Sequence, residues 1–335
     1  METYIAKEPV IERIYPQRLK VENIAGRCDL LKLENPDKST TRNIVYIPGL
    51  AGDTMVKFIQ GAKKWVDQAN VFGVLHSGII DQPGNECLFA RTGKGDGSTV
   101  NNSIEVTADD WVRDVKVAIL HAIESNQPLD LICHSFGGIF AIKAIHDLIA
   151  KSSMERYRAA GQKPIRLILI SVPTYVEPAL PDRRPLLGTD QNQPFSFYHD
   201  ANSLDAMSTP DDRIPMASMT AFDGIHDYLL YCRLIAVEPD KEQFNQSFRQ
   251  LITNLPLYFS LLKDTDIQIA SLHPYQDRWV SKQAGECLER MIGRYILIEK
   301  FDIDYAFNHS TTNINAHDAE FVNEWMRVVA KIINI

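Results

Sequence analysis

A serine between a predicted strand and a predicted helix is the chain's clearest chemical feature. The stretch "LDLICHSFGGIFAIKA" carries Ser135 after a short apolar run and before a helical pattern. A serine nucleophile needs such a sharp turn, because the turn presents Oγ clear of the sheet and directs the next backbone N–H toward the developing oxyanion. Small residues are demanded two positions before and after the serine, where Cys133 and Gly137 stand. Ser135 is therefore a candidate nucleophile, and a purely structural serine in a helix-opening turn is the alternative.

The elements that must position this serine alternate between strand and helix. Short apolar runs, rich in β-branched residues, predict buried strands at residues 42–50, 69–78, 129–135 and 165–173. Helical patterns lie between them, at residues 55–68, 108–124 and 137–151. This alternation predicts an α/β fold with a mostly parallel sheet and helices on both faces. Residues 10–33 favour an antiparallel pair that opens the sheet.

The middle of the chain differs in composition and predicts an insertion. From about residue 177 to 220, proline, aspartate and serine are frequent and periodicity is weak, which favours loop. Residues 221–263 then carry helix-like stretches rich in aromatic side chains. We expect a largely helical lid at residues 178–264, inserted into a core made of residues 1–177 and 265–335.

Two strands and a helix complete the predicted core. Apolar runs at residues 266–274 and 294–301 predict the last two strands. Residues 316–332 predict a closing amphipathic helix, for which Asn315 and Asp318 can form a capping pair. The sheet is thus expected to continue beyond the lid.

Three segments resemble the α/β-hydrolase superfamily, and within it the thioesterases of polyketide and nonribosomal peptide synthesis. They match a strand with a P-G-x-x-G loop, a G-x-S-x-G-G turn with its helix, and a further strand: "YIPGLAG", "CHSFGGIFAIKAIHDLIA" and "GQKPIRLILIS". The likeness covers most of residues 42–176 and returns near the C-terminus. It implies an α/β-hydrolase fold in which Ser135 is the nucleophile of a Ser-Asp-His triad.

The resemblance also indicates two places for the triad acid. Many such thioesterases carry an aspartate at the end of the strand that here reads "LILIS", but this chain has Ser171 there. Other members of the superfamily keep the acid in the loop after the next strand, where "SLHPYQDRWVS" offers Asp277. Asp277 is the predicted acid, with a surface role as its alternative. Asp302 and Asp304, after the last predicted strand, are weaker candidates.

The base is expected between the last strand and the closing helix, which gives the order Ser, Asp, His along the chain. The stretch "DYAFNHSTTN" places His309 there. His317 falls in the first turn of the predicted helix, and His134 is expected to pack beside the nucleophile. Neutral His309 would take the proton of Ser135 and return it to the leaving group, while Asp277 stabilises the imidazolium.

Two backbone N–H groups are expected to form an oxyanion hole. One belongs to Phe136, directly after the serine, and the other to Leu50 in the "PGLAG" loop. Losing one such donor costs about 10²–10³ in turnover. Because both donors are backbone groups, a side-chain substitution at Leu50 tests packing more than the hole.

Composition and charge exclude several other classes of protein. The 335 residues carry 35 basic and 43 acidic side chains, and the formal charge of −8 opposes binding to nucleic acid or stable insertion into an anionic membrane. The five cysteines lack a C-x-x-C pair, so reduced thiols are expected. The histidines lack metal-ligand spacing, and the glycines of "RTGKGDGSTVNNS" lack phosphate-loop spacing. We expect no cofactor and no catalytic metal.

The sequence predicts a cytoplasmic serine hydrolase that cleaves an acyl thioester. No secretory signal is expected, and no uncharged apolar run reaches the length of about 18 residues that a membrane span needs. The substrate would be an acylated small molecule or an acyl carrier. The nearest alternatives are a carboxylesterase, a lipase or an acyltransferase, and the alternative of another class is a non-catalytic hydrolase-fold binding protein. The aromatic lid suits an acyl channel or, equally, helices that pack against each other.

Overall fold

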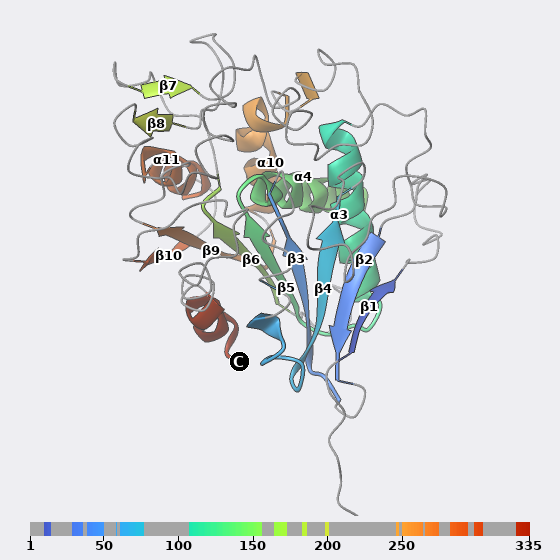
Figure 1. Cartoon of the computed structure of the whole chain (residues 1–335). Helices are drawn as coiled ribbons and strands as arrows, with labels where there is room; N and C mark the ends of the chain where they lie inside the picture. Colours follow the sequence, from blue (N-terminus) through green and yellow to red (C-terminus); the bar gives the residue numbers. More distant parts are fainter. Residues whose placement is uncertain are drawn as a thin grey trace, which may run out of the picture.

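The structure is a computed structural model of the chain (Figure 1). It describes residues 10–14, 29–35, 39–49, 58, 61–76, 107–155, 164–172, 183–185, 198–200, 246–247, 250–263, 265–274, 282–293, 298–303 and 326–335. The order of the strands and the helices that pack on them follow from these segments.

One large sheet forms the centre of the molecule (Figure 1). In its described part the strand order is β1-β2-β4-β3-β5-β6-β9-β10. The bounds along the chain are β1 (Val10–Ile14), β2 (Asp29–Glu34), β3 (Arg42–Ile47), β4 (Ala69–Leu75), β5 (Leu129–His134), β6 (Ile165–Ile170), β9 (Ile267–Pro274) and β10 (Ile298–Ile303). β2 pairs antiparallel with β1 and β4, and the other neighbours are parallel. The predicted mostly parallel sheet with an antiparallel opening pair is confirmed.

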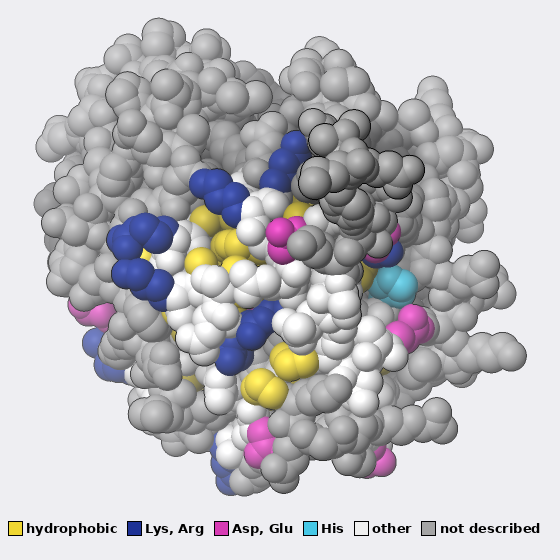
Figure 2. Space-filling model, turned by 90° about the horizontal axis from the view of Figure 1, so that it is seen from below, with side chains coloured by type: hydrophobic (Ala, Val, Ile, Leu, Met, Phe, Trp, Pro, Cys, Tyr) yellow, Lys and Arg dark blue, Asp and Glu magenta, His cyan; other side chains and the backbone are white. Residues whose placement is uncertain are grey.

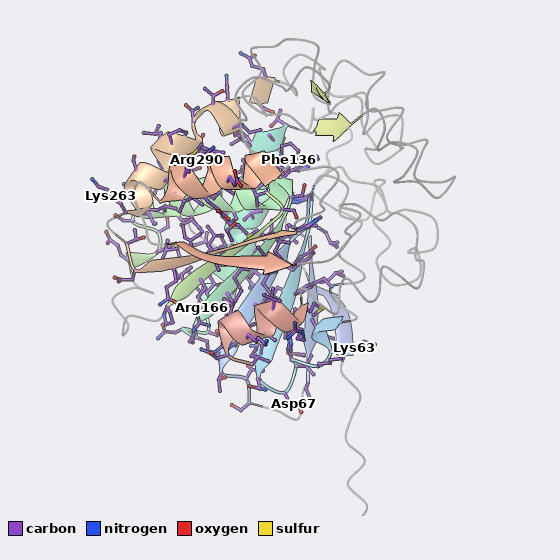
Figure 3. The ribbon with its side chains drawn as sticks, turned by 90° about the vertical axis from the view of Figure 1, so that its left-hand side faces the viewer. Lys63, Asp67, Phe136, Arg166, Lys263 and Arg290 are labelled. Atoms are coloured by element: carbon purple, nitrogen blue, oxygen red, sulfur yellow. The ribbon has the colours of Figure 1, made fainter. Side chains whose placement is uncertain are left out.

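Both faces of the central strands are buried, because helices cover each face. Successive residues of a strand point to opposite faces, so Ile47 enters one apolar core and Tyr46 enters the other. The helices on the first face are α3 (Ala108–Ile123), α4 (Phe136–Ala150), α10 (Leu255–Leu262) and α11 (Lys282–Ile292). Residue 58, the segment at residues 61–66 and the helix at residues 326–333 cover the second face. Figure 3 shows the sheet between the layer that carries Lys263 and Arg290 and the layer that carries Lys63 and Asp67.

Helices α3 and α4 form where the sequence predicts them, for two different local reasons. The backbone N–H of Thr107 donates to Asp110 Oδ2 at 2.8 Å, which is half of a capping box at the start of α3. α4 is apolar on most of its surface, and a helix of that kind must be buried on several sides. It packs between the sheet, α3 and α10. Both predicted helices are confirmed to within one residue at each end.

Several predicted boundaries differ from the observed ones. The predicted helix at residues 55–68 is helical at 58 and 61–62 and continues as turn to 68 in its described part. Within the region predicted as loop, β7 (Arg183–Pro185) and β8 (Tyr198–Asp200) form a short antiparallel pair, so that prediction is wrong at these residues. A backbone ladder of three residue pairs leaves little trace in hydrophobic periodicity.

α10, at the end of the predicted lid, packs against α4 within the main apolar core. Its aromatic side chains Tyr258 and Phe259 are buried there. The lid at residues 178–264 stays a prediction.

None of the described helices is long and apolar enough to cross a membrane.

A buried ion cluster fixes the end of the sheet where the parallel strands begin. Asp130 of β5 accepts from Arg42 Nη1 of β3 at 2.8 Å and from Arg166 Nη1 of β6 at 3.4 Å. Arg42 also donates to the carbonyl of Ile333 in the last helix. Burial raises the pKa of Asp130, and the two arginines oppose that shift. Seen from below, Lys and Arg side chains lie at several separate places, and Asp and Glu side chains also occur on this face (Figure 2).

A second charged cluster joins α3 to α4. Asp147 of α4 contacts Lys116 of α3 as well as Lys143 and His146 of its own helix. Burial raises the pKa of Asp147, but the hydrogen bonds from these three partners outweigh it, so the pKa falls from 3.8 to about 2. The carboxylate therefore stabilises the packing of the two helices while it is charged.

Asp147→Asn should lower the free energy of unfolding at neutral pH, because the variant loses this charge. The folded pKa of about 2 lies below the ordinary 3.8, so the contribution is complete above the ordinary value and is lost as the pH falls toward 2. Urea unfolding of both proteins across this pH range measures the difference, which should shrink on acidification. Glu124→Gln, at a half-exposed carboxylate, is the control and should change stability by less than about 0.5 kcal/mol. A difference independent of pH would contradict the assignment.

Candidate active site

Ser135 occupies a strained turn between β5 and α4. Its backbone has φ 54° and ψ −132°, a conformation that costs a non-glycine residue about 1–3 kcal/mol. Hydrogen bonds hold the turn on both sides: Ser135 N–H donates to the Ile170 carbonyl at 2.9 Å, and Gly138 N–H donates to the Ser135 carbonyl at 3.0 Å. The strand, turn and helix predicted around this serine are therefore confirmed.

The turn lies at the topological switch point of the sheet, where the connections after two neighbouring parallel strands lead to opposite sides. β3 and β5 are parallel neighbours, and the chain leaves β3 toward β4 on one side and β5 toward β6 on the other. In open α/β sheets, the crevice at the carboxyl ends of two such strands is the usual place for a ligand. Pro48 and Gly49 after β3 thus face Ser135 after β5.

Three glycines allow the backbones to meet at this crevice. A Cβ at Gly49 would lie 2.9 Å from Ser135 Cβ and 3.3 Å from its Oγ, so the absence of a side chain leaves room beside the hydroxyl. A Cβ at Gly137 would lie 2.3 Å from the Ile47 carbonyl oxygen, which shows how closely α4 approaches the end of β3. Gly138 allows a similar approach to the side chain of Val172. The contact of Gly137 with the end of β3 explains why a small residue is needed two positions after the serine.

Cys133 fills the position two before the serine without disturbing the turn. It is fully buried in β5, opposite Ile47 of β3 and Leu169 of β6, and it belongs to the first apolar core. Burial raises the pKa of the Cys133 thiol, so the group stays neutral. Cys133 is therefore a small core residue and does not compete with Ser135 as a nucleophile.

Phe136 begins α4 directly after the serine. Its N–H belongs to the first turn of the helix, where the N–H groups point toward the N-terminal end. The partial positive charge of that end favours a developing negative charge nearby. Leu50, the second predicted donor, lies outside the described residues.

The predicted acid and base, Asp277 and His309, also lie outside the described residues, as do Asp304 and His317. In sequence, Asp277 follows β9 and His309 follows β10. Both strands run parallel to β6 and have their carboxyl ends at the same edge of the sheet as Ser135. One expectation is wrong: Asp302 lies within β10, which extends to Ile303.

His134 and Ser171 flank the turn within the described part of the chain. His134 ends β5 and is buried beside Ser135, as predicted. Ser171 follows β6 with φ 50°, and its N–H donates to the Leu272 carbonyl at 3.0 Å. Its hydroxyl is buried and has no hydrogen-bond partner among the described residues. The end of β6 thus carries a hydroxyl where the resemblance places a carboxylate.

The sequence analysis missed His76, which lies directly after β4. Its Nε2 donates to the Pro48 carbonyl at 3.1 Å, and its ring stacks on Trp111. The only available signal was a histidine at the end of an apolar strand, which does not reveal a contact with a residue 28 positions away. No group of three or more His, Cys, Asp or Glu side chains that could hold a metal occurs among the described residues.

No protein-family model matches this chain, and no curated protein matches it by sequence. Among solved structures, it resembles a thermostable carboxyl esterase from Bacillus coagulans with a TM-score of 0.53, at 11% identity over 98% of each chain. Weaker likenesses include naproxen esterase (carboxylesterase NP) from Bacillus subtilis, with a TM-score of 0.49, 10% identity and coverage of 96% of this chain and 91% of that one. A thioesterase domain from the curacin biosynthetic pathway has a TM-score of 0.45 and 13% identity, over 93% of this chain and 99% of that one. The chain has the α/β-hydrolase fold.

Alanine substitutions at Gly49 and Gly137 should separate reactivity from stability. Gly137→Ala places Cβ against backbone oxygens that cannot move aside, so it should destabilise the fold by about 3 kcal/mol or more. Gly49→Ala presses on the Ser135 side chain and should lower its reactivity by on the order of 10- to 100-fold, with a smaller loss of stability. Thermal unfolding and the rate of modification by a fluorophosphonate measure the two effects. Equal losses of both properties in both variants would contradict this division.

Proposed function

We propose that the protein is a serine hydrolase that cleaves acyl thioesters through an acyl-enzyme on Ser135. The observation that carries the proposal is the strained turn at Ser135, with Gly49 leaving space beside Oγ where β3 and β5 end. A strained backbone that its surroundings hold in place is typical of functional sites. The shared fold with a carboxyl esterase supports a hydrolase of this general type.

In the proposed mechanism, His309 takes the proton of Ser135 as Oγ attacks the acyl carbonyl, and Asp277 stabilises the resulting imidazolium. The N–H groups of Phe136 and Leu50 stabilise the negative charge on the carbonyl oxygen. His309 then protonates the leaving thiolate, which departs as a thiol and leaves the acyl group on Ser135. Water, deprotonated by His309, attacks this ester and releases the carboxylic acid, and the proton returns to Ser135.

A carboxylesterase or a lipase is the nearest alternative, because the same triad accepts an oxygen or a sulfur leaving group. Transfer of the acyl group to an alcohol or an amine would use the same acyl-enzyme. The strained turn favours catalysis over a purely binding function, because a serine nucleophile needs a sharp turn between strand and helix and a binding surface does not.

The proposed substrate is an acylated small molecule or an acyl carrier in the cytoplasm. We propose that the lid at residues 178–264 contributes an acyl channel. Tyr258 and Phe259 belong to the main core and would not line such a channel, so the proposal depends on other aromatic residues of the lid.

Fluorophosphonate labelling tests the triad directly. The wild type should be modified at Ser135, as mapped by mass spectrometry, and Ser135→Ala should abolish the modification. His309→Ala and Asp277→Ala should each slow it by about 10²–10⁴-fold, because the hydroxyl loses its base or the base loses its orientation. Circular dichroism of each variant controls for folding.

Two outcomes would change the proposal. Labelling that survives Asp277→Ala would assign the acid elsewhere, and Asp304→Ala would then be the next variant to measure. A folded wild type without any labelling would favour the non-catalytic binding protein.

The leaving group and the acyl chain form a separate prediction. A thioester should be hydrolysed with a kcat/KM at least about tenfold above that of the oxygen ester with the same acyl group, a difference of about 1.4 kcal/mol in transition-state binding. Activity should also rise with acyl length between acetyl and palmitoyl, because a longer chain buries more apolar surface. Faster ester cleavage would favour the esterase, and activity independent of chain length would contradict the acyl channel.

A further inference from the structure

His76 connects the end of β4 to the loop that faces the nucleophile. The ring is 2% exposed, and its Nε2 lies 3.1 Å from the carbonyl oxygen of Pro48. A carbonyl oxygen only accepts hydrogen bonds, so Nε2 carries the proton and donates it. Pro48 immediately precedes Gly49, the residue that lies against Ser135 Oγ.

The same carbonyl lies between His76 and the start of α4. A Cβ at Gly137 would lie 2.6 Å from the Pro48 oxygen, so the first turn of α4 approaches this peptide as well. The carbonyl and the N–H of a trans peptide point in opposite directions. A fixed Pro48 carbonyl therefore also fixes the direction of the Gly49 N–H.

Two buried aromatic side chains hold the His76 ring. Trp111 of α3 stacks on it with a centroid separation of 5.4 Å and an angle of 28°, and Phe140 of α4 meets it edge to face at 5.4 Å and 81°. Such surroundings suit a phenylalanine as well as a histidine, whereas a buried imidazole costs free energy unless it is hydrogen-bonded. The N–H that reaches Pro48 is a contact that a phenylalanine could not make.

We propose that His76 is a positioning residue for the oxyanion loop, defined as Pro48 and Gly49, the two described residues that precede the predicted donor Leu50. Its hydrogen bond to the Pro48 carbonyl holds the loop at the distance from Ser135 that charge stabilisation requires. The inference rests on the proposed acyl-enzyme function and adds to it a residue that does not touch the substrate. Because the oxyanion exists only in the transition state, loss of this bond affects kcat more than KM.

Four variants test the proposal by steady-state hydrolysis of an acyl thioester and of a p-nitrophenyl ester. His76→Phe keeps an aromatic ring and removes the donor, and it should lower kcat by on the order of 10- to 100-fold while KM changes by less than about threefold. His76→Gln places an amide N–H near the position of Nε2 and should restore most of kcat. His76→Asn is too short to reach Pro48 and should behave like His76→Phe, which preserves the comparison if the phenylalanine variant does not fold.

Phe72→Leu is the control for a general loss of packing, since Phe72 lies in β4, the strand that ends directly before His76, and contacts His121 instead of the loop. It should lower the melting temperature and leave kcat within about threefold of the wild type. A folded His76→Phe or His76→Asn with wild-type kcat overturns this inference and leaves the proposed function standing. A loss of kcat in Phe72→Leu equal to that in the His76 variants has the same consequence. A wild type that neither reacts with a fluorophosphonate nor hydrolyses either substrate overturns the proposed function together with the inference.

Discussion

The close approach of α4 to the carboxyl end of β3 is the constraint on which the rest of this structure depends. A Cβ at Gly137 would lie 2.3 Å from the Ile47 carbonyl oxygen, so only a glycine lets the helix begin there. A helix that starts so near the strand end requires the chain to reverse within one residue. Ser135 makes that reversal at φ 54°. The strained backbone, the position of Oγ beside Gly49 and the direction of the helix N-terminus all follow from this one contact.

The opposite end of the sheet supplies the rigidity that this strain needs. Asp130 joins Arg42 and Arg166 where β3, β5 and β6 begin, and Arg42 also donates to the last helix. Removing one partner of such a pair would cost about 3–5 kcal/mol, because the remaining charge would be left buried and unpaired, so the three strands are tied to one arrangement at this end. Two apolar cores add burial on both faces of the same strands. These interactions align the strands on either side of the strained turn.

The features that the sequence predicted are those whose causes are local. The change from strand to helical periodicity around Ser135, with a glycine two residues later, marks the turn directly. The contact of His76 with Pro48 is not local: it depends on β4 pairing beside β3, and no pattern of neighbouring residues encodes it. The prediction that Asp302 follows the last strand was wrong, because pairing with the parallel strand β9 extends β10 beyond its apolar run. Asp277 and His309 stay predictions of order and spacing along the chain.

The groups around Ser135 Oγ that the structure describes belong largely to the backbone. Phe136 contributes an N–H, Gly49 contributes the absence of a side chain, and Pro48 contributes a carbonyl whose direction His76 determines. Dipoles that the fold holds in place before the reaction need no reorganisation when charge develops, which makes them effective in a site with little water. Side-chain identity at these positions then matters mainly through the backbone it permits. In the proposed mechanism, charge stabilisation is consequently a property of the fold, and the choice of acyl group and leaving group is left to side chains further from Ser135.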